Sequence, residues 1–230
     1  MIISFCIPCM NRTYDLKKIM SSLIETANVS PPVEILVLDY NSQDDLAEYI
    51  ESVRKENKLL PENKLTYLKY TGRDYYHMAH ARNLATLAAS GEWIIPFATD
   101  IVPHKEFIQR LRMIIDKDKP GIVYGGVGLV GVSVCRKDEF IAAGGYDERF
   151  EFYGPEDKEL LGRLIRRGNR LVGYDPRLLE VMHTIARERR RNYRVQYSKR
   201  ESHHLMFPIL EQSREEKVLV ANKDVQWGQW

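Results

Sequence analysis

Short apolar runs alternate with amphipathic segments along the first half of the chain. The apolar runs predict buried strands at residues 2–7, 33–38, 65–70 and 93–97. Between and after them, apolar residues spaced three and four apart predict helices at residues 15–27, 46–55, 77–90 and 105–115. This alternation is typical of an α/β fold with a mostly parallel sheet flanked by helices on both faces.

The second half follows a different pattern. Residues 121–134 (GIVYGGVGLVGVSV) are rich in Gly and Val, which predicts strands with close backbone approaches. Residues 154–168 predict a helix, with Pro155 at its first position and Gly168 as its stop. The Gly-rich run lacks the Lys-Ser/Thr of a phosphate-binding loop, so that interpretation is not favoured.

Polar clusters follow three of the predicted strands: PCMNR, DYNSQDD and ATD. The carboxyl ends of parallel strands meet at one edge of a sheet, where ligands bind in such folds. Asp39 at this edge suits hydrogen bonds from a nucleobase or ribose, and Ser42 and Asp44 suit capping of the following helix. Asp100 offers hard oxygens for Mn2+ or Mg2+, with His104 as a second ligand or a plain surface residue.

Glu156 and Asp157 open the predicted helix at residues 154–168. Acidic residues in a first turn stabilise a helix without any further role. The preceding stretch, GGYDERFEFYGP, is irregular and rich in aromatic residues, which favours a pocket wall with one carboxylate as general base. The basic run at residues 187–194 is either a solvated face or a site for a diphosphate, an anionic acceptor or a membrane surface.

Composition limits the choice of function. The 230 residues carry a net charge of only +2, which gives no reason to expect a nucleic-acid partner. No run is long and apolar enough for a membrane span, and the odd number of three cysteines argues for a reducing, cytoplasmic setting. Cys6 and Cys9 form a C-x-x-C, but a zinc site needs two more ligands and Cys135 stands alone, so we predict no redox or zinc role.

Four ordered blocks between residues 2 and 185 resemble the family 2 glycosyltransferases with the GT-A (Rossmann-like) fold. ISFCIPCMNRTYDLKKIMSSL resembles the opening strand and helix, and VEILVLDYNSQDD resembles the donor block. AHARNLATLAASGEWIIPFATD resembles the A-R-N helix that runs into the strand before the D-x-D metal motif. GGYDERFEFYGPEDKELLGRLIRRGNRL resembles the catalytic block, also found in galactosyltransferase-like members.

The resemblance implies a single domain at residues 1–185. Residues 1–100 would form its nucleotide-binding half and residues 101–185 its acceptor and catalytic half, with the basic segment and tail at residues 186–230 packed on it. The donor would be a nucleotide sugar, with a UDP-sugar as the first choice. The acceptor would be a glycan or a lipid-linked group, and contact with a membrane surface stays open. The donor would contact Pro8, Asn11, Arg12, Asp39, Arg82 and Asn83.

The catalytic and metal residues follow from the same blocks. Asp157 matches the base that deprotonates the acceptor hydroxyl, and Glu156 would hold the acceptor or order the site. Asp100 and His183 would hold Mn2+ or Mg2+. The first acid of the D-x-D is replaced by Ala98, which keeps a non-catalytic nucleotide- or glycan-binding domain open as an alternative. A nucleotidyltransferase is less favoured, because the loop after the first strand contains no Gly.

Overall fold

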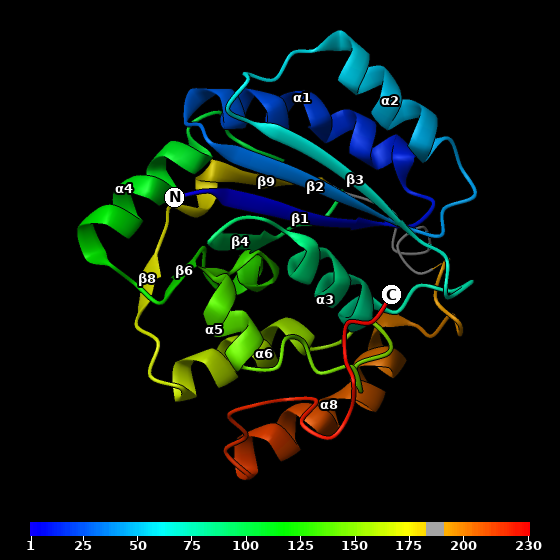
Figure 1. Cartoon of the computed structure of the whole chain (residues 1–230). Coiled ribbons are helices and arrows are strands. Elements are labelled where there is room, and N and C mark those ends of the chain that lie inside the picture. Colours follow the sequence, from blue (N-terminus) through cyan, green and yellow to red (C-terminus); the bar gives the residue numbers. More distant parts are fainter. Residues whose placement is uncertain (183–190) are drawn as a thin grey trace.

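The computed structural model describes residues 1–182 and 191–230, in which a seven-stranded mixed sheet is flanked by helices (Figure 1). The strand order is β3-β2-β1-β4-β7-β6-β8. The strands are β1 (Ile3–Cys9), β2 (Val33–Tyr40), β3 (Lys64–Tyr70), β4 (Trp93–Pro96), β6 (Ile122–Tyr124), β7 (Val134–Arg136) and β8 (Leu171–Gly173). The first four are parallel, and β7 runs antiparallel to both of its neighbours. A small second sheet pairs β5 (Ile101–Pro103) with β9 (Leu179–Val181).

Helices cover both faces of the large sheet because alternate strand residues point to opposite sides. In β1, Phe5 and Ile7 pack into one apolar cluster with α1, α2 and α4, whereas Cys6 packs into a second cluster with α3, α5, α6 and α8. The helices are α1 (Thr13–Val29), α2 (Leu46–Glu56), α3 (Met78–Ala88), α4 (Phe107–Asp118), α5 (Lys137–Ala142), α6 (Glu156–Arg166) and α8 (Lys199–Glu215).

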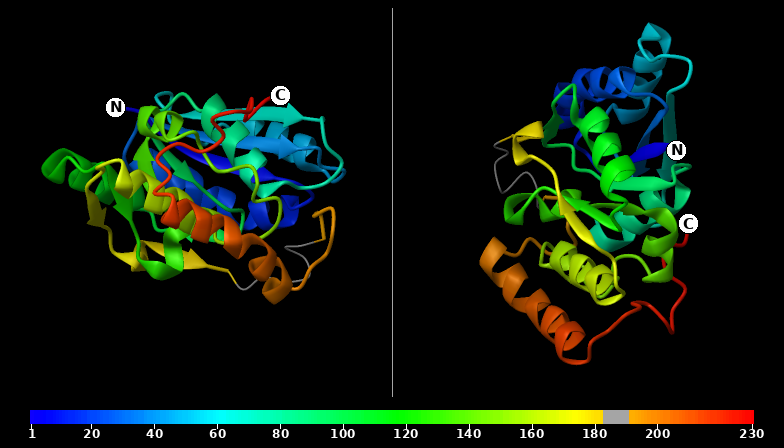
Figure 2. Two further views of the ribbon diagram at one scale, coloured as in Figure 1. Left: turned by 90° about the horizontal axis from the view of Figure 1, so that it is seen from below. Right: turned by 90° about the vertical axis from the view of Figure 1, so that its left-hand side faces the viewer.

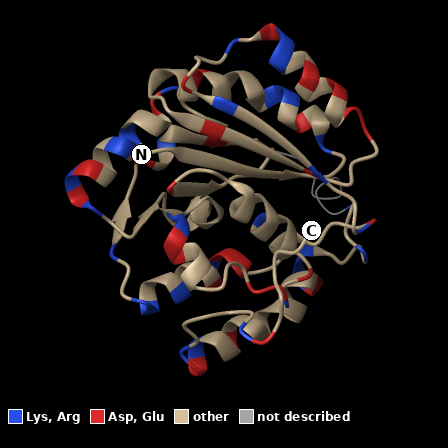
Figure 3. Ribbon diagram, viewed as in Figure 1, with Lys and Arg blue, Asp and Glu red and all other residues tan. Residues whose placement is uncertain are grey.

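The C-terminal part of the chain lies against the second face. Helix α8 packs against α6, and the right-hand view of Figure 2 shows it as the outermost layer on that side. The tail then returns to α3, where the backbone carbonyl of Gln229 lies 3.1 Å from Nε2 of His80. Figure 3 shows Lys and Arg interspersed with Asp and Glu along the outer helices, in keeping with the small net charge.

The predicted strands and helices of the first half are confirmed to within a few residues, whereas residues 121–134 differ. Only their ends are strands, and Val127–Val132 form a 3-10 helix between β6 and β7. Short α5 and long α8 were not predicted at all. Gly168 follows α6 with φ of 94°, a left-handed conformation that glycine adopts without strain, and so confirms the predicted stop.

The predicted caps of the second helix are wrong. Asp45, and not Ser42 or Asp44, precedes α2, and it makes no side-chain cap bond. Asp44 instead accepts a 3.0 Å hydrogen bond from the backbone N–H of Thr13, the first residue of α1. The polar cluster after β2 therefore fixes the loop after β1, which carries Met10 and Arg12 of a cavity lining.

No helix among the described residues is long and apolar enough to cross a membrane.

Candidate functional site

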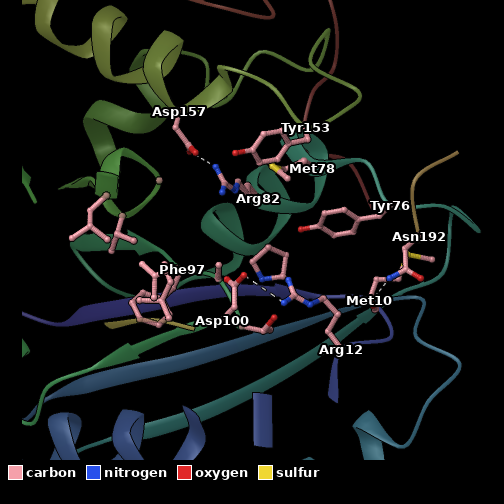
Figure 4. A pocket seen from close by; sticks show the side chains of 18 of the residues that line it. Met10, Arg12, Tyr76, Met78, Arg82, Phe97, Asp100, Tyr153, Asp157 and Asn192 are labelled. Atoms are coloured by element: carbon pink, nitrogen blue, oxygen red, sulfur yellow. Dashed lines mark hydrogen bonds and ion pairs between the residues drawn. The ribbon is translucent and has the colours of Figure 1, made fainter. Parts of the chain in front are cut away.

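A cavity of about 250 Å³ lies at the carboxyl ends of β1 and β4, opposite the start of α6 (Figure 4). One side is formed by the residues that end or follow the two strands, and the other by α3, α6 and the 3-10 helix. The lining includes Pro8, Met10, Arg12, Tyr76, Met78, Arg82, Phe97, Ala98, Thr99, Asp100, Gly131, Tyr153, Asp157, Asn192 and Tyr193. Five of the predicted site residues are therefore in one place: Pro8, Arg12, Arg82, Asp100 and Asp157.

Arg12 and Asp100 form the charged pair on the strand side of the cavity. Nη2 of Arg12 lies 3.6 Å from Oδ2 of Asp100 and 2.9 Å from Oδ2 of Asp15. Burial opposes the charge on Arg12, but the two carboxylates outweigh it and raise the pKa of Arg12 above its ordinary value. The side chain of Asp100 is only 9% exposed, and the backbone N–H of Met182 bonds to its carbonyl, so β9 holds this corner of the site.

Arg82 and Asp157 form a second charged pair on the opposite wall, as the dashed line between them in Figure 4 marks. The hydroxyl of Tyr146 also donates to Oδ1 of Asp157 at 3.2 Å, and the Arg82 guanidinium lies 5.1 Å from the centre of the Tyr146 ring. Although burial opposes the charge on Arg82, Asp157 and Tyr146 hold the pKa of Arg82 well above its ordinary value. The carboxylate of Asp157 is thus fixed by two donors and still borders the cavity.

Glu156 has a different environment from its neighbour Asp157. Its side chain is 2% exposed, and Oε2 accepts a 3.0 Å hydrogen bond from the backbone N–H of Gly154. Burial and the adjacent negative charge of Asp157 raise the pKa of Glu156 to about 8, against the opposing effect of Arg82. Near neutral pH Glu156 therefore keeps its proton, and it is Asp157 whose carboxylate borders the cavity.

Two predicted donor contacts, Asp39 and Asn11, lie outside the cavity lining. Asp39 is 1% exposed and accepts from the Ser42 N–H at 2.7 Å and the Tyr67 hydroxyl at 2.6 Å. The Asn11 side chain bonds to Gln43 N–H at 2.6 Å. These contacts order the loops around the strand ends, and direct binding of a nucleotide by Asn11 or Asp39 stays a prediction.

Asn83 is fully buried, and its side chain forms hydrogen bonds with the backbone of Tyr146. Its Oδ1 accepts from the Tyr146 N–H at 2.7 Å, and its Nδ2 donates to the Tyr146 carbonyl at 2.9 Å. Since Tyr146 bonds to Asp157, Asn83 acts on the site through Tyr146. Asn83 makes no contact with the cavity itself, so its predicted donor contact has no support from its position.

Asp100, which pairs with Arg12, is the carboxylate of the lining beside the strand ends that could help to hold a divalent cation. Asp100 lies next to Thr99, whose hydroxyl is buried without a hydrogen-bond partner. The described residues contain no cluster of three acidic, His or Cys side chains that could hold a metal. His183 falls outside the described residues, and His104 is exposed on another surface. Because Mg2+ is often held by one or two carboxylates together with substrate phosphates, Asp100 and Thr99 fit such a site.

None of the three cysteines lines the cavity. Cys6 and Cys9 are three residues apart in β1, which places them roughly 10 Å apart along the strand. They pack on opposite faces of the sheet, and burial raises the pKa of each thiol to about 12. Cys6 and Cys9 are therefore too far apart to form a disulfide in this strand, and the absence of a redox or zinc role stays a prediction.

Sequence reasoning missed the segment that closes one side of the cavity. Asn192 donates to the carbonyl of Met10 at 2.7 Å and accepts from Nδ2 of Asn11 at 2.9 Å. Tyr193 follows it and packs edge-on against Tyr76, with ring centres 5.7 Å apart. Both lie inside the run ARERRRNYR, for which the sequence analysis predicted a role of the basic residues only.

Comparisons with known proteins agree with this architecture. The family model described as Glycosyl transferase family 2 matches residues 4–155. No curated protein matches the chain. The likeness to galactosyltransferase-like members stays a prediction.

Solved structures of distant proteins share the fold. S. aureus TarS has a TM-score of 0.67 and 16% identity over 93% of this chain, which spans only 43% of TarS. TarS 1-349 in complex with UDP-GlcNAc has a TM-score of 0.67 and 17% identity, with 95% of this chain and 70% of that one covered. The mannosyltransferase PcManGT from Pyrobaculum calidifontis, in complex with GDP-Man and Mn2+, has a TM-score of 0.65 and 17% identity, with 91% and 68% covered.

Because the family model matches more than half of the sequence, this chain, with its GT-A fold, belongs to glycosyl transferase family 2.

Proposed function

We propose that this chain is an inverting glycosyltransferase that moves a sugar from a nucleotide diphosphate sugar to a hydroxyl group. A UDP-sugar is the first choice of donor. The acceptor would be a glycan or a lipid-linked group. One observation carries the proposal: a single cavity holds Asp157 at the start of α6 opposite Asp100 in the turn between β4 and β5, with an arginine beside each carboxylate. Family membership and the nucleotide sugars in the TarS and PcManGT complexes support the choice of donor.

The strand side of the cavity suits the diphosphate of the donor. Arg12 supplies a cation that remains charged at any physiological pH, and Asp100 with Thr99 supplies oxygens for a metal ion. A bound Mn2+ or Mg2+ would neutralise charge on the diphosphate leaving group. Arg82 supplies a second cation from the opposite wall, within the same cavity.

Asp157 is positioned to accept the proton of the acceptor hydroxyl. As the acceptor oxygen forms its bond to the anomeric carbon, the bond from that carbon to the diphosphate breaks, and the hydroxyl proton passes to Asp157. Tyr146 and Arg82 fix the carboxylate, which reduces the entropy lost in reaching the reactive geometry. Glu156 keeps its own proton near neutral pH and so does not compete for this role. A single displacement of this kind inverts the anomeric configuration.

The test is a thermal-shift panel of nucleotide sugars with and without Mn2+, followed by product analysis with the donor that stabilises most. Stabilisation rises with ligand concentration over Kd, so the true donor should raise Tm more than its free nucleotide. We expect a metal-dependent shift and a product with inverted configuration. Stabilisation by a nucleotide sugar without any turnover across an acceptor panel would favour a non-catalytic binding domain. A product of retained configuration would contradict the mechanism.

A further inference from the structure

Residues 221–228 lie against the loop between α5 and α6 that carries Tyr146. In Figure 1 this part of the chain is red, and it runs from α8 to the C-terminus beside α3. The backbone N–H of Ala221 donates to the carbonyl of Ala143 at 3.0 Å, and the N–H of Gly228 donates to Oε1 of Glu148 at 2.8 Å. The loop is therefore bound on both sides of Tyr146 by a segment that follows it far along the chain.

Asn222 connects this segment directly to the backbone of Tyr146. Its Nδ2 donates to the carbonyls of Gly144 and Tyr146, each at 2.8 Å. Its Oδ1 accepts from the backbone N–H of Glu148 at 3.0 Å. Both polar atoms of this half-buried side chain therefore bind one loop. The φ of Asn222 is 53°, a left-handed conformation that Asn and Gly adopt more readily than other residues.

The loop and the segment fit closely together. Gly144 and Gly145 both have left-handed backbone conformations, with φ of 78° and 64°. A Cβ atom at Gly144 would overlap the carbonyl oxygen of Ala221, and one at Gly145 would overlap the ring of Trp227. Such close packing leaves the loop little room to shift, because protein interiors resist even small changes of volume. The position of the loop therefore depends on the segment that covers it.

Tyr146 links this loop to the proposed base. The residue is 2% exposed, and its hydroxyl donates to Oδ1 of Asp157 at 3.2 Å. Burial holds the pKa of Tyr146 well above its ordinary value, so the hydroxyl keeps its proton and remains a donor. Asn83, which also binds the Tyr146 backbone, lies within the family match at residues 4–155, whereas residues 221–228 lie outside it. The Asp157 carboxylate is thus connected through Tyr146 to a part of the chain that the family model does not include.

We propose that Asn222 is a positioning residue for the proposed base, because it fixes the loop from which the Tyr146 hydroxyl binds and orients Asp157. The inference rests on the proposed glycosyltransferase function and names a residue that serves it. Asn222 does not line the cavity, so the acceptor proton still passes directly to Asp157. The effect should fall on turnover and not on donor binding, because Arg12 and Asp100 lie on the strand side of the cavity.

The test compares Asn222→Gly with the matched control Asn28→Ala. Glycine keeps the left-handed backbone and removes only the side chain. Asn28 is also half-buried, and its side chain makes three hydrogen bonds to residues 58, 60 and 63, none of which lines the cavity. Both variants should lower Tm, since each loses its side-chain hydrogen bonds. Only Asn222→Gly should lower kcat, by about tenfold, because a small misplacement of a reacting group slows turnover strongly.

A double-mutant cycle with Tyr146→Phe separates positioning from a general loosening of the fold. Turnover is measured as nucleotide release from UDP-GlcNAc, UDP-glucose or GDP-mannose with the acceptor panel, and UDP affinity by calorimetry with Mn2+. Phe keeps the ring and removes the hydroxyl that binds Asp157. If Asn222 acts through this hydroxyl, Asn222→Gly should lower kcat by less than about twofold in the Tyr146→Phe background, while UDP affinity stays unchanged. Asn222→Asp keeps the acceptor for Glu148 but loses the donor for the Tyr146 carbonyl, and it replaces Asn222→Gly if that variant does not fold.

The outcomes are distinct from those that test the function. Unchanged kcat in a folded Asn222 variant, or an undiminished effect in the Tyr146→Phe background, overturns the inference and leaves the proposed function standing. A loss of kcat in Asn28→Ala as large as in Asn222→Gly does the same, because lower stability alone would explain both. If neither Asn222 variant folds while Asn28→Ala does, the residue serves stability and the inference is overturned. A wild type that turns over no nucleotide sugar overturns the proposed function, and the inference with it.

Discussion

Replacing Asp157 by Asn changes one charge in the structure and tests the proposed base directly. Asn keeps the shape of the side chain but loses the basic lone pair that would take the acceptor proton. As a helix-start residue alone, Asp157 would contribute roughly 0.3–1 kcal/mol to stability. The structure adds a further term, because Arg82 would lose its closest anionic partner while only 14% of its side chain is exposed.

The size of this added term depends on Glu156. Removing one partner of a fully buried pair costs about 3–5 kcal/mol. Here the Asp157 side chain is 19% exposed, and Glu156 lies 3.6 Å from the Arg82 guanidinium. Once the charge of Asp157 is gone, burial still raises the pKa of Glu156, but its negative neighbour no longer does, and Arg82 favours the ionised form that would pair with it. We therefore expect a total loss of roughly 1–3 kcal/mol, and a folded protein.

Activity should fall far more than stability. Loss of a positioned general base reduces turnover by about two to four orders of magnitude. Donor affinity should change little, since Arg12 and Asp100 on the strand side are untouched. The assay combines turnover, a calorimetric UDP titration with Mn2+, and thermal unfolding, with Lys158→Gln on the same helix as a control for loss of a nearby charge. Turnover of Asp157→Asn within a few-fold of the wild type would refute the reasoning and place the base elsewhere.

Four further predictions test other parts of the site. The pKa of Glu156 is about 8 in the folded state and 4.5 in the unfolded state, so the stability of the wild type falls as pH rises between these values. Glu156→Gln has no such pH dependence, so its Tm advantage over the wild type should grow across this window. A constant difference in Tm would contradict the raised pKa. Asp100→Ala should weaken UDP binding in Mn2+ by about tenfold or more but have little effect in EDTA, and an equal effect in both would remove the metal role. A methyl group at Gly131 would meet an oxygen of the proposed base at 2.9 Å, so Gly131→Ala should lower kcat severalfold with little change in UDP affinity, and unchanged kcat would show that the carboxylate can move. Cys6→Ser/Cys9→Ser should keep transferase activity at some loss of Tm, and a folded but inactive double variant would revive a chemical role for the thiols.

Local patterns were enough to predict the first half of the fold. The apolar run VEILVL became β2, and its strand is buried along its whole length because helices cover both faces. Each such strand is marked by its own residues and by the polar cluster after it, so no distant contact is needed to recognise it. The parallel order then follows from the helical connections.

Helix α8 was missed although its sequence carries a start signal. Ser198 and Glu201 form a capping box, in which each side chain bonds to the backbone of the other. Pro208 lies inside the helix, where proline normally breaks the backbone pattern, and this obscured the helical spacing of Met206 and Leu210. Burial of these two residues against the second core cluster stabilises the helix, and that contact cannot be read from local sequence.

The site shows the same division between local and distant signals. Asp100 and Asp157 were identified from a strand end and a helix start, which are features of neighbouring residues. Tyr193 was not identified, because its position depends on the hydrogen bond between the side chains of Asn11 and Asn192. These two residues are separated by 181 positions in the sequence. No periodicity indicates which of thirteen tyrosines returns to a given strand end.

The charges of the cavity give a physical reason why Ala98 stands where the family resemblance predicts the first acid of a D-x-D motif. In the described structure Arg12 lies beside Asp100, and Arg82 beside Asp157, so each carboxylate of the lining has a cation within 4 Å. An acidic residue in place of Ala98 would add another negative charge on the strand side of the cavity. Arg12 already forms ion pairs with both Asp100 and Asp15 there. A partly buried carboxylate without a cation beside it is costly unless a metal is always bound. Ala98 packs against the apolar core instead, which lets the cavity keep its shape before a metal and a diphosphate arrive together. Metal affinity would then depend on the phosphates of the donor, and the ion and the nucleotide would bind cooperatively.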